Sequence, residues 1–371
     1  MLIKILCQIF VNINNNGLKK LLLLIFIIGQ TTYSQSFRKY SNEFLNIGVD
    51  AAAFGMGRAV VASSSDVNSI YWNPAGLVHV KDYQGSLMHA EYFAGIAKYD
   101  HIGFAMPIDG VSAIGFSVIR FGVDDILDTT ELIDSQGNID YNRINLFSAT
   151  DYAINMAYAR ALPVQGLNIG FNGKVVHRSI GDFASSWGFG LDASLQFESN
   201  GWNFGLMLRD ITTTFNAWSI DKDAFKKIQD AVPNQNQELP ETIELTLPKA
   251  QLGVAKKFEI TRDFGLLTEF DLNMRFSKTN DIIATDFVSI DPAFGFQFDY
   301  VNMVFLRAGI GNVQNLQEFN GSKSVSFQPN LGVGFRYEGI YIDYALTNIG
   351  SVGNALYSNV FSIKIDFDYF R

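Results

Sequence analysis

Apolar and polar residues alternate along most of the chain, in segments of about ten residues. In one of these segments the apolar positions are Leu167, Ile169, Phe171 and Val175. The polar positions between them are Asn168, Asn172, Lys174 and Arg178. Because successive side chains of a strand point to opposite faces of a sheet, this pattern predicts strands with one apolar and one polar face. The same pattern recurs over residues 264–276, 330–338 and 361–369.

The pattern places fourteen strands, at residues 84–97, 99–108, 111–122, 150–162, 167–180, 185–198, 202–215, 248–260, 264–276, 288–301, 303–312, 326–339, 340–350 and 359–370. Their number is even, and their lengths are near the 9–11 residues that a tilted strand needs to cross a bilayer. We therefore predict an all-β fold, a 14-stranded antiparallel transmembrane β-barrel. A soluble β-sandwich is the competing interpretation, because it would show the same alternation.

The lengths of the connections separate these two interpretations. Connections after the even-numbered strands are short, whereas the long ones, 123–149, 216–247 and 313–325, follow strands 3, 7 and 11. Long and short connections therefore lie at opposite ends of the strands. Outer-membrane barrels have short periplasmic turns and longer outer loops, and a sandwich has no reason for such sorting. The sorting favours an outer-membrane location with both termini in the periplasm.

Residues 1–34 have the pattern of a signal peptide. Lys4, Lys19 and Lys20 precede an apolar run at 21–28, and small residues lead to an expected cleavage point after Ser34. The apolar run of 8 residues is too short to span a bilayer as a helix. A buried core helix is the alternative interpretation. Export beyond the inner membrane agrees with the predicted barrel.

Composition narrows the class of protein further. Of the 371 residues, 48% are hydrophobic and 18% are charged, with 32 Phe, 15 Tyr and 32 Gly. Many aromatic residues and glycines with few charges suit strands that face lipid outside and pack tightly inside. A mean hydropathy of +0.10 is too polar for a helical membrane protein. The net charge of -9 argues against a nucleic-acid partner, which needs a basic surface.

The sequence contains no motif for catalysis, a cofactor or a metal ion. Its four histidines, at positions 79, 89, 101 and 177, form no HExxH motif. The only cysteine, Cys7, belongs to the predicted signal peptide, so no disulfide is expected. We therefore predict that the protein is not an enzyme and has no catalytic residue, cofactor or metal site. A serine–histidine pair on the barrel wall, as in an outer-membrane hydrolase, is the alternative that the sequence leaves open.

The segment before the first strand differs from the rest of the chain. Residues 44–80 are rich in Ala, Gly and Ser, carry almost no charge and do not alternate. Small residues permit close packing in a confined space, so the segment predicts a plug that fills the lumen of a wide barrel. We place this hatch at 35–83 and the barrel at 84–371. Asn73 and Pro74 are expected to anchor it, because the asparagine amide can satisfy backbone groups at a bend.

The hatch also carries a recognisable motif, made of Gly55, Met56, Gly57, Asp66, Trp72, Asn73, Pro74, Ala75 and Gly76. In these residues the chain resembles the amino-terminal hatch of the FadL-like barrels, and within them the PorV/PorQ family of Bacteroidetes. The resemblance extends to residues 140–143 and 147–152 and to the closing strand, so it covers essentially the whole mature chain. Gly76 stands where PorV itself usually has a lysine. The chain is therefore more similar to a second PorV paralogue than to PorV.

The resemblance implies a function in the type IX protein secretion system. PorV receives exported cargo proteins at the outer membrane through their carboxy-terminal signal domains and passes them to the attachment machinery. The expected partners are outer-membrane lipid and either secreted cargo or secretion components. The alternative is a FadL-type channel for hydrophobic small molecules, which would have a greasy pocket below its outer loops.

The longest predicted loops contain apolar residues that a merely solvated loop would not need. These candidates for binding a partner are Ile126, Leu127, Leu132, Phe215, Trp218 and Phe225. Exposed apolar patches usually mark interaction sites. The competing interpretation is that these side chains pack on one another over the barrel mouth. A short helix is expected in the second loop, capped by Asp221 and ending near Ala231.

Overall fold

The computed structural model describes residues 41–133, 136–231, 242–317, 321–347 and 358–370. The predicted signal peptide, with Cys7, lies outside these residues, and so do residues 35–40 of the predicted hatch.

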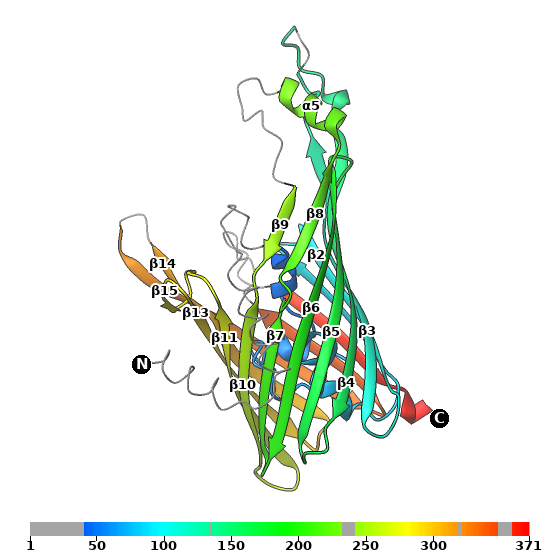
Figure 1. Cartoon of the computed structure of the whole chain (residues 1–371), viewed down its shortest axis with the longest axis vertical. Helices are drawn as coiled ribbons and strands as arrows, with labels where there is room; N and C mark the ends of the chain where they lie inside the picture. Colours follow the sequence, from blue (N-terminus) through cyan, green and yellow to red (C-terminus); the bar gives the residue numbers. More distant parts are fainter. Residues whose placement is uncertain (1–40, 134–135, 232–241, 318–320, 348–357, 371) are drawn as a thin grey trace, which may run out of the picture. The chain divides into compact units, whose positions relative to one another are not determined.

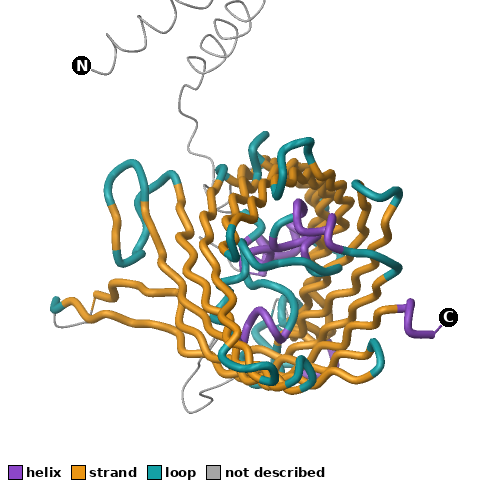
Figure 2. The backbone as a smooth tube through the Cα atoms, turned by 90° about the horizontal axis from the view of Figure 1, so that it is seen from below, coloured by secondary structure: helices purple, strands orange, loops and turns teal. Residues whose placement is uncertain are grey.

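One antiparallel sheet closes on itself to form a barrel (Figures 1 and 2). Its first six strands are β1 (Gln84–Tyr92), β2 (Ala97–Pro107), β3 (Ser112–Asp128), β4 (Asn145–Ala161), β5 (Leu167–Ile180) and β6 (Ala184–Ser199). Each of them pairs with the next along the chain. The last strand, β17 (Ser358–Asp366), pairs with β1 and closes the barrel.

Two of the barrel strands are each broken into two pieces. β7 (Trp202–Arg209) and β8 (Thr214–Ile220) both pair with β6 and form the seventh strand. β9 (Ile243–Thr246) pairs with β8, and β10 (Lys249–Glu259) pairs with β7, so these two form the eighth. The first break holds Asp210 and Thr213 at positive φ. The second contains Pro248, which has no N–H to donate to a ladder.

The remaining barrel strands are β11 (Phe264–Arg275), β13 (Ser289–Tyr300), β14 (Val304–Gln317), β15 (Lys323–Tyr337) and β16 (Ile340–Thr347). A two-residue strand, β12 (Ile283–Ala284), pairs with β13 inside the connection that follows β11. The barrel therefore has fourteen strands in chain order, which confirms the predicted all-β fold.

The two faces of the wall differ as the alternation predicts. On β15, Leu331 and Val333 are 60% and 50% exposed on the outside, whereas Asn330 is buried inside. On β11, Glu269 and Asp271 are buried on the inner face. An apolar outer face suits contact with lipid, and the polar side chains are turned toward the lumen.

The long connections are shorter than predicted, because the strands continue past the expected boundaries. β3 and β4 pair as far as Asp128 and Asn145, and β14 and β15 pair as far as Gln317 and Lys323. The boundaries 123–149, 216–247 and 313–325 are therefore wrong. Main-chain pairing needs no apolar face, so a polar hairpin continues beyond the point where the alternation fades. In Figure 1 the extension of β3 and β4 rises past the rest of the wall, with α5 (Lys222–Ala231) near the top, and that of β14 and β15 projects to the left.

The segment before β1 forms short helical turns inside the ring of strands (Figure 2). They are η1 (Glu43–Asn46), α3 (Ala51–Gly55), α4 (Ser69–Trp72) and η2 (Pro74–His79). Two further short turns lie outside it, η3 (Tyr141–Arg143) and η4 (Phe367–Phe370). None of the helices in the described ranges is long and apolar enough to cross a membrane. We call residues 41–83 the hatch.

Candidate functional site

The hatch touches the wall backbone to backbone, and glycines on the inner face of the wall make this approach possible. A Cβ atom at Gly332 would lie 2.9 Å from the Cα of Gly55, and one at Gly309 would overlap the backbone of Gly57. Gly57 has φ +67°, a conformation that favours glycine. Five other wall glycines also lie against hatch backbone, namely Gly170, Gly205, Gly253, Gly295 and Gly311. The Gly55-Met56-Gly57 motif is thus a docking surface for β13, β14 and β15.

Two buried carboxylates of β11 hold the middle of the hatch. The backbone N–H groups of Val60 and Val61 donate to Asp271 Oδ2, at 3.0 and 3.1 Å. The N–H of Ala62 donates to Glu269 Oε1 at 2.6 Å. A buried N–H that lost such a partner would cost about 1–3 kcal/mol.

The closing strand holds the hatch at two further positions. Lys364 forms an ion pair with Asp66, and Ser362 Oγ donates to Asp50 Oδ1 at 2.8 Å. Burial, together with the nearby charges of Asp343 and Asp66, raises the pKa of Asp50 to about 7. Asp50 thus sits close to neutral pH in its titration when the hatch is docked.

The remaining motif residues stabilise the hatch internally. Asn73 Nδ2 donates to the carbonyls of Val61 and Leu195, at 2.8 and 3.1 Å, and its Oδ1 accepts from Ala75 N. Its amide therefore joins two hatch segments to β6, more widely than the local bend that the sequence suggested. Any side chain at Gly76 would overlap the Ser64 carbonyl, so this position has no room for a lysine.

Pro74 opens η2, where its missing N–H costs nothing, and is buried. Trp72 is also buried and donates from Nε1 to the carbonyl of Val49 at 3.0 Å. The anchoring role of the motif remains a prediction, and these contacts are its physical basis.

A cavity of about 610 Å³ lies between the hatch and the long connections. Its lining comes from the hatch, from the strand ends nearest the long connections and from the connection after β11. The hatch supplies Glu43, Asn46, Ile47, Arg58, Tyr71 and Trp72. The wall and the connection supply Arg209, Lys249, Ala250, Gln251, Asn273, Met274, Arg275, Lys278, Thr279, Asn280, Asp281, Asp291, Asn312, Gln314 and Gln328. Most of these side chains are polar, so the cavity is not the greasy pocket expected of a hydrocarbon channel.

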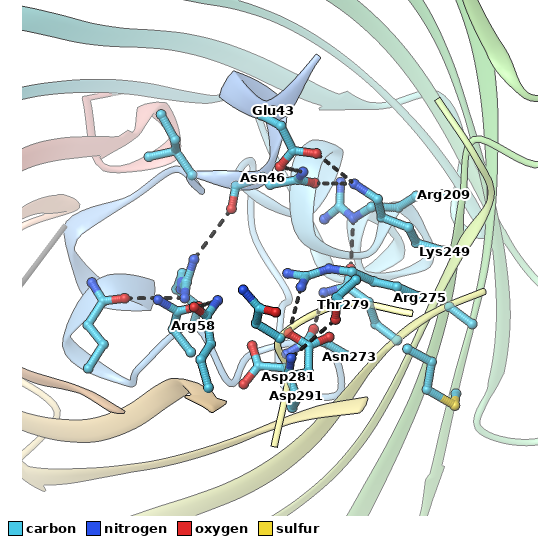
Figure 3. A pocket seen from close by; sticks show the side chains of 18 of the residues that line it. Glu43, Asn46, Arg58, Arg209, Lys249, Asn273, Arg275, Thr279, Asp281 and Asp291 are labelled. Atoms are coloured by element: carbon cyan, nitrogen blue, oxygen red, sulfur yellow. Dashed lines mark hydrogen bonds and ion pairs between the residues drawn. The ribbon is translucent and has the colours of Figure 1, made fainter. Parts of the chain in front are cut away.

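Basic side chains reach the cavity from several elements (Figure 3). Lys249 Nζ donates to Asn46 Oδ1 at 2.9 Å, and Arg275 forms an ion pair with Asp281 at 2.7 Å. Arg209 donates to Gln251 Oε1 at 2.7 Å and to the Tyr71 carbonyl at 2.8 Å. The cavity thus presents several fixed N–H donors to whatever occupies it.

The sequence missed these basic residues as a site. Lys249 and Arg275 lie on the polar face of alternating segments, but the alternation does not indicate which inward positions share a cavity. One signal was present, because Arg58 is the only Lys or Arg between residues 41 and 80.

The six loop candidates do not converge on one site, and none of them lines the cavity. Ile126 and Leu127 lie on β3, Phe215 and Trp218 on β8, Phe225 on α5, and Leu132 in the connection after β3. Two make local contacts: Phe215 packs on Phe189, and Trp218 lies 5.3 Å from the Arg178 guanidinium. Asp221 accepts from the N–H groups of Asp223 and Ala224, as predicted for the cap of α5.

The structure gives little support to a serine–histidine pair. Ser63, Ser64, Ser65 and His79 line a second cavity of about 170 Å³, at the other end of the hatch. Ser64 Oγ, however, is hydrogen-bonded to Ser69 Oγ at 2.8 Å. Within the described ranges, no group of three or more His, Cys, Asp or Glu side chains is placed to hold a metal ion.

Comparison with known proteins places the fold in one class. The chain is similar to "CymD monoaromatic hydrocarbon channel", with a TM-score of 0.53 at 12% identity over 89% of this chain and 98% of that one. It is similar to the Pseudomonas putida toluene transporter TodX, with 0.51 at 13% over 85% and 96%. A Pseudomonas aeruginosa FadL homologue gives 0.50 at 11% over 86% and 98%. The protein thus has the FadL-like fold, a 14-stranded barrel of the outer-membrane type with an amino-terminal segment outside the strands.

No family model matches the sequence, and no curated protein matches it. At 11–13% identity the structural likeness defines the fold and leaves the substrate open. The function of this chain therefore has to be inferred from the residues that line its own lumen.

Proposed function

We propose that the protein is an outer-membrane channel of the FadL type, which admits a small molecule to the cavity and passes it when the hatch moves. The observation that carries the proposal is the cavity of about 610 Å³, bounded by the long connections on one side and the hatch on the other. Its volume lies within the range of about 300–1,000 Å³ that is typical of small-molecule sites. In this proposal the long connections face the cell exterior and both termini face the periplasm.

The solved structures support this class of function over the others considered. Two of them are named as a hydrocarbon channel and a toluene transporter. Their likeness to this chain supports the passage of a small molecule through its lumen. We do not propose a hydrocarbon as the molecule that passes, because the cavity of this chain is lined mostly by polar side chains.

A hatch that can be locked provides the test. The N–H of Ala51 donates to Ser362 Oγ at 3.1 Å, so cysteines at these two positions would be neighbours. We expect Ala51→Cys with Ser362→Cys to admit citrate or glucose into proteoliposomes under reducing conditions, and to stop doing so after oxidation. The protein with Ser362→Cys alone is the matched control and should ignore the oxidant.

The outcomes separate two claims. Entry that continues after the disulfide has formed would show that the hatch is not the gate. No entry of either solute, with reduced or oxidised protein, would contradict transport itself.

A role in type IX secretion is the second candidate, and the strand extensions favour it. β3 and β4 pair as far as Asp128 and Asn145. Leu127 on β3 is 61% exposed, and Tyr141 in the connection between the two strands is 72% exposed. Here the protein would bind exported cargo or secretion components on its long connections. Replacing 129–144, the connection between β3 and β4, by a short Gly-Ser turn should then leave the barrel inserted but abolish cross-links to such proteins in vivo. A full-length protein that forms no cross-link to secreted or secretion proteins would end this candidate.

A further inference from the structure

We propose that the cavity is a binding site for a small, multiply charged organic anion of the carboxylate or phosphate-ester class. The inference rests on the proposed function, since it names the class of molecule that the lumen admits. It follows from the charges, hydrogen-bond partners and volume of the cavity.

Positive charge exceeds negative charge in the lining, although the chain as a whole has a net charge of -9. The basic residues are Arg58, Arg209, Lys249, Arg275 and Lys278. The acidic residues are Glu43, Asp281 and Asp291. A recess with an excess of one sign of charge, and with walls of low dielectric constant, concentrates ligands of the opposite sign.

The hydrogen-bond partners show which of the basic groups form no ion pair. Arg275 is paired with Asp281, and Lys278 is paired with Asp286. Arg58 and Arg209 differ, because in the described part of the chain no carboxylate lies within ion-pair distance of either guanidinium. Arg209 donates to an amide and a carbonyl oxygen, and Arg58 donates to Gln328 Oε1 and to the Asn46 carbonyl, both at 3.4 Å.

Arg58 is also held in an unusual backbone conformation. It has φ 66°, in the left-handed region that a residue with a side chain rarely adopts. Such a conformation persists only where the surrounding structure enforces it, and it is found preferentially at functional positions. Here it follows Gly57 at the end of α3, where the N–H of Arg58 donates to the carbonyl of Ala53 at 2.9 Å. The turn brings its guanidinium to the cavity, as Figure 3 shows.

The shape of the donor groups narrows the ligand further. A guanidinium is a planar fork that matches the two oxygens of a carboxylate or a phosphate. Arg58 on the hatch and Arg209 on β7 line the same cavity from different elements, so an anion with two charged groups can engage both. Neutral donors such as Asn273, Asn312 and Gln314 also line it and suit a hydroxylated carbon skeleton.

A hydrocarbon would not fit this lining. It would cover polar groups without replacing their hydrogen bonds to water, and each buried unpaired group costs about 1–3 kcal/mol. A polyamine would meet the same basic residues and be repelled. The lining thus selects against both the neutral apolar and the cationic class.

Calorimetric titration of the mature protein in detergent tests the proposal, with citrate and glucose 6-phosphate as probes and toluene and putrescine as comparisons. We expect one or both anions to bind, with an affinity that falls as salt is added, and putrescine not to bind. Arg58→Gln and Arg209→Gln should each weaken anion binding by about tenfold to a hundredfold, the usual range for a hydrogen bond to a charged group. Arg58→Lys should restore part of the loss, because it keeps the charge but not the fork.

Arg336→Gln is the matched control. Arg336 lies on β15 near the short turn to β16, far along the strand from Gln328 in the cavity, and this variant should bind as the wild type does. Toluene binding without anion binding, or anion binding that ignores both arginine substitutions, would overturn the inference.

The experiments distinguish a failure of the anion site from a failure of the proposed channel function. If glucose crosses the barrel but neither anion binds, the channel stands and this inference fails. If citrate binds but no solute crosses, the site stands and transport fails.

Discussion

The two sides of the lumen are built differently around the same hatch. On the side of β16, β17 and β1–β5, hatch and wall share an apolar core that includes Phe54, Tyr92, Tyr99 and Ile119, all fully buried. On the side of β7 and β10–β15 lie the wall glycines that meet the hatch backbone, apart from Gly170 on β5, and above them lies the polar cavity.

This difference shows how a barrel can be plugged and still keep room for a ligand. Large apolar side chains fill much of the first side, so the hatch is held there mainly by burial, in addition to its polar contacts with Ser362 and Lys364 of β17. On the second side the hatch is held close to the wall by backbone contact and by the carboxylates of β11, which take little space. The space above them is then available to long polar side chains. The cavity is thus a consequence of glycine docking and not a packing defect.

The largest loss of hatch docking is expected from a substitution where the backbones of hatch and wall touch. Gly309→Val would place a branched side chain on the backbone of Met56 and Gly57, and neither can move aside without undocking the hatch. Overpacking alone costs about 1–3 kcal/mol, and rigid backbone contacts put this case at the upper end or above. Hydrogen-exchange protection of residues 50–62 should fall by a hundredfold or more, about 2.8 kcal/mol at 1.4 kcal/mol per tenfold.

Gly110→Val is the control for that substitution. Gly110 lies in a short turn, where an added Cβ atom would meet nothing within 4 Å beyond its chain neighbours, so the hatch should keep its protection. Equal protection in the two variants would mean that backbone contact does not hold the hatch.

A loss of hatch docking of similar size is expected on the apolar side. Phe54→Ala removes a fully buried ring from the shared core, and such truncations cost about 3–5 kcal/mol. Limited proteolysis should then cut the hatch of an intact barrel. Asn46→Ala on the cavity side should have much less effect, because Asn46 is only partly buried. Similar cleavage of both variants would remove the distinction between the two sides.

A smaller effect is expected from the carboxylates on the cavity side. Asp271→Ala leaves the N–H groups of Val60 and Val61 without their acceptor, which costs about 1–3 kcal/mol. The exchange rates of these two amides should rise by about tenfold to a hundredfold, while those in β-strands stay unchanged. Asp263→Ala, in an exposed turn, serves as the control. Unchanged exchange at residues 60 and 61 would show that Asp271 does not hold the hatch.

The smallest expected change in hatch docking is its dependence on pH. Docking raises the pKa of Asp50 from its ordinary value of 3.8 to about 7, so the docked hatch binds this proton more tightly than the free hatch does. Docking is therefore strongest below about pH 4 and weakens as the pH rises through 7. Protection factors of the hatch should be lower at pH 8 than at pH 5, and Asp50→Asn should reduce that difference. A wild-type hatch with the same protection at both values would contradict this linkage.

The barrel could be predicted because alternation is a local property of the sequence. Leu331 and Asn330 differ in polarity, and the structure places them on opposite faces of the wall. Strand ends were predicted less well, because residues 123–128 and 145–149 pair through main-chain groups that any sequence possesses. The hatch was visible as a segment, since its glycines and alanines form no strand pattern.

The cavity could not be predicted, because it depends on contacts between distant parts of the chain. Arg58 and Arg209 are far apart in the sequence and share the lining only because the hatch folds against β7, β10 and β11. Gly309 and Gly332 likewise read as ordinary strand glycines until Gly57 and Gly55 are placed beside them. The part that each of these residues plays around the cavity is apparent only when its neighbour in the fold is known.

The contacts of Ser362 and Lys364 with the hatch have a consequence for assembly. The two partners in each contact are separated by 312 and 298 residues, almost the full length of the barrel. Both side chains belong to the strand that closes the ring against β1, and a shift of one residue would turn them toward lipid. Closure of the barrel between β17 and β1 and docking of the hatch therefore depend on each other. Only a barrel closed in the correct register can form both sets of contacts.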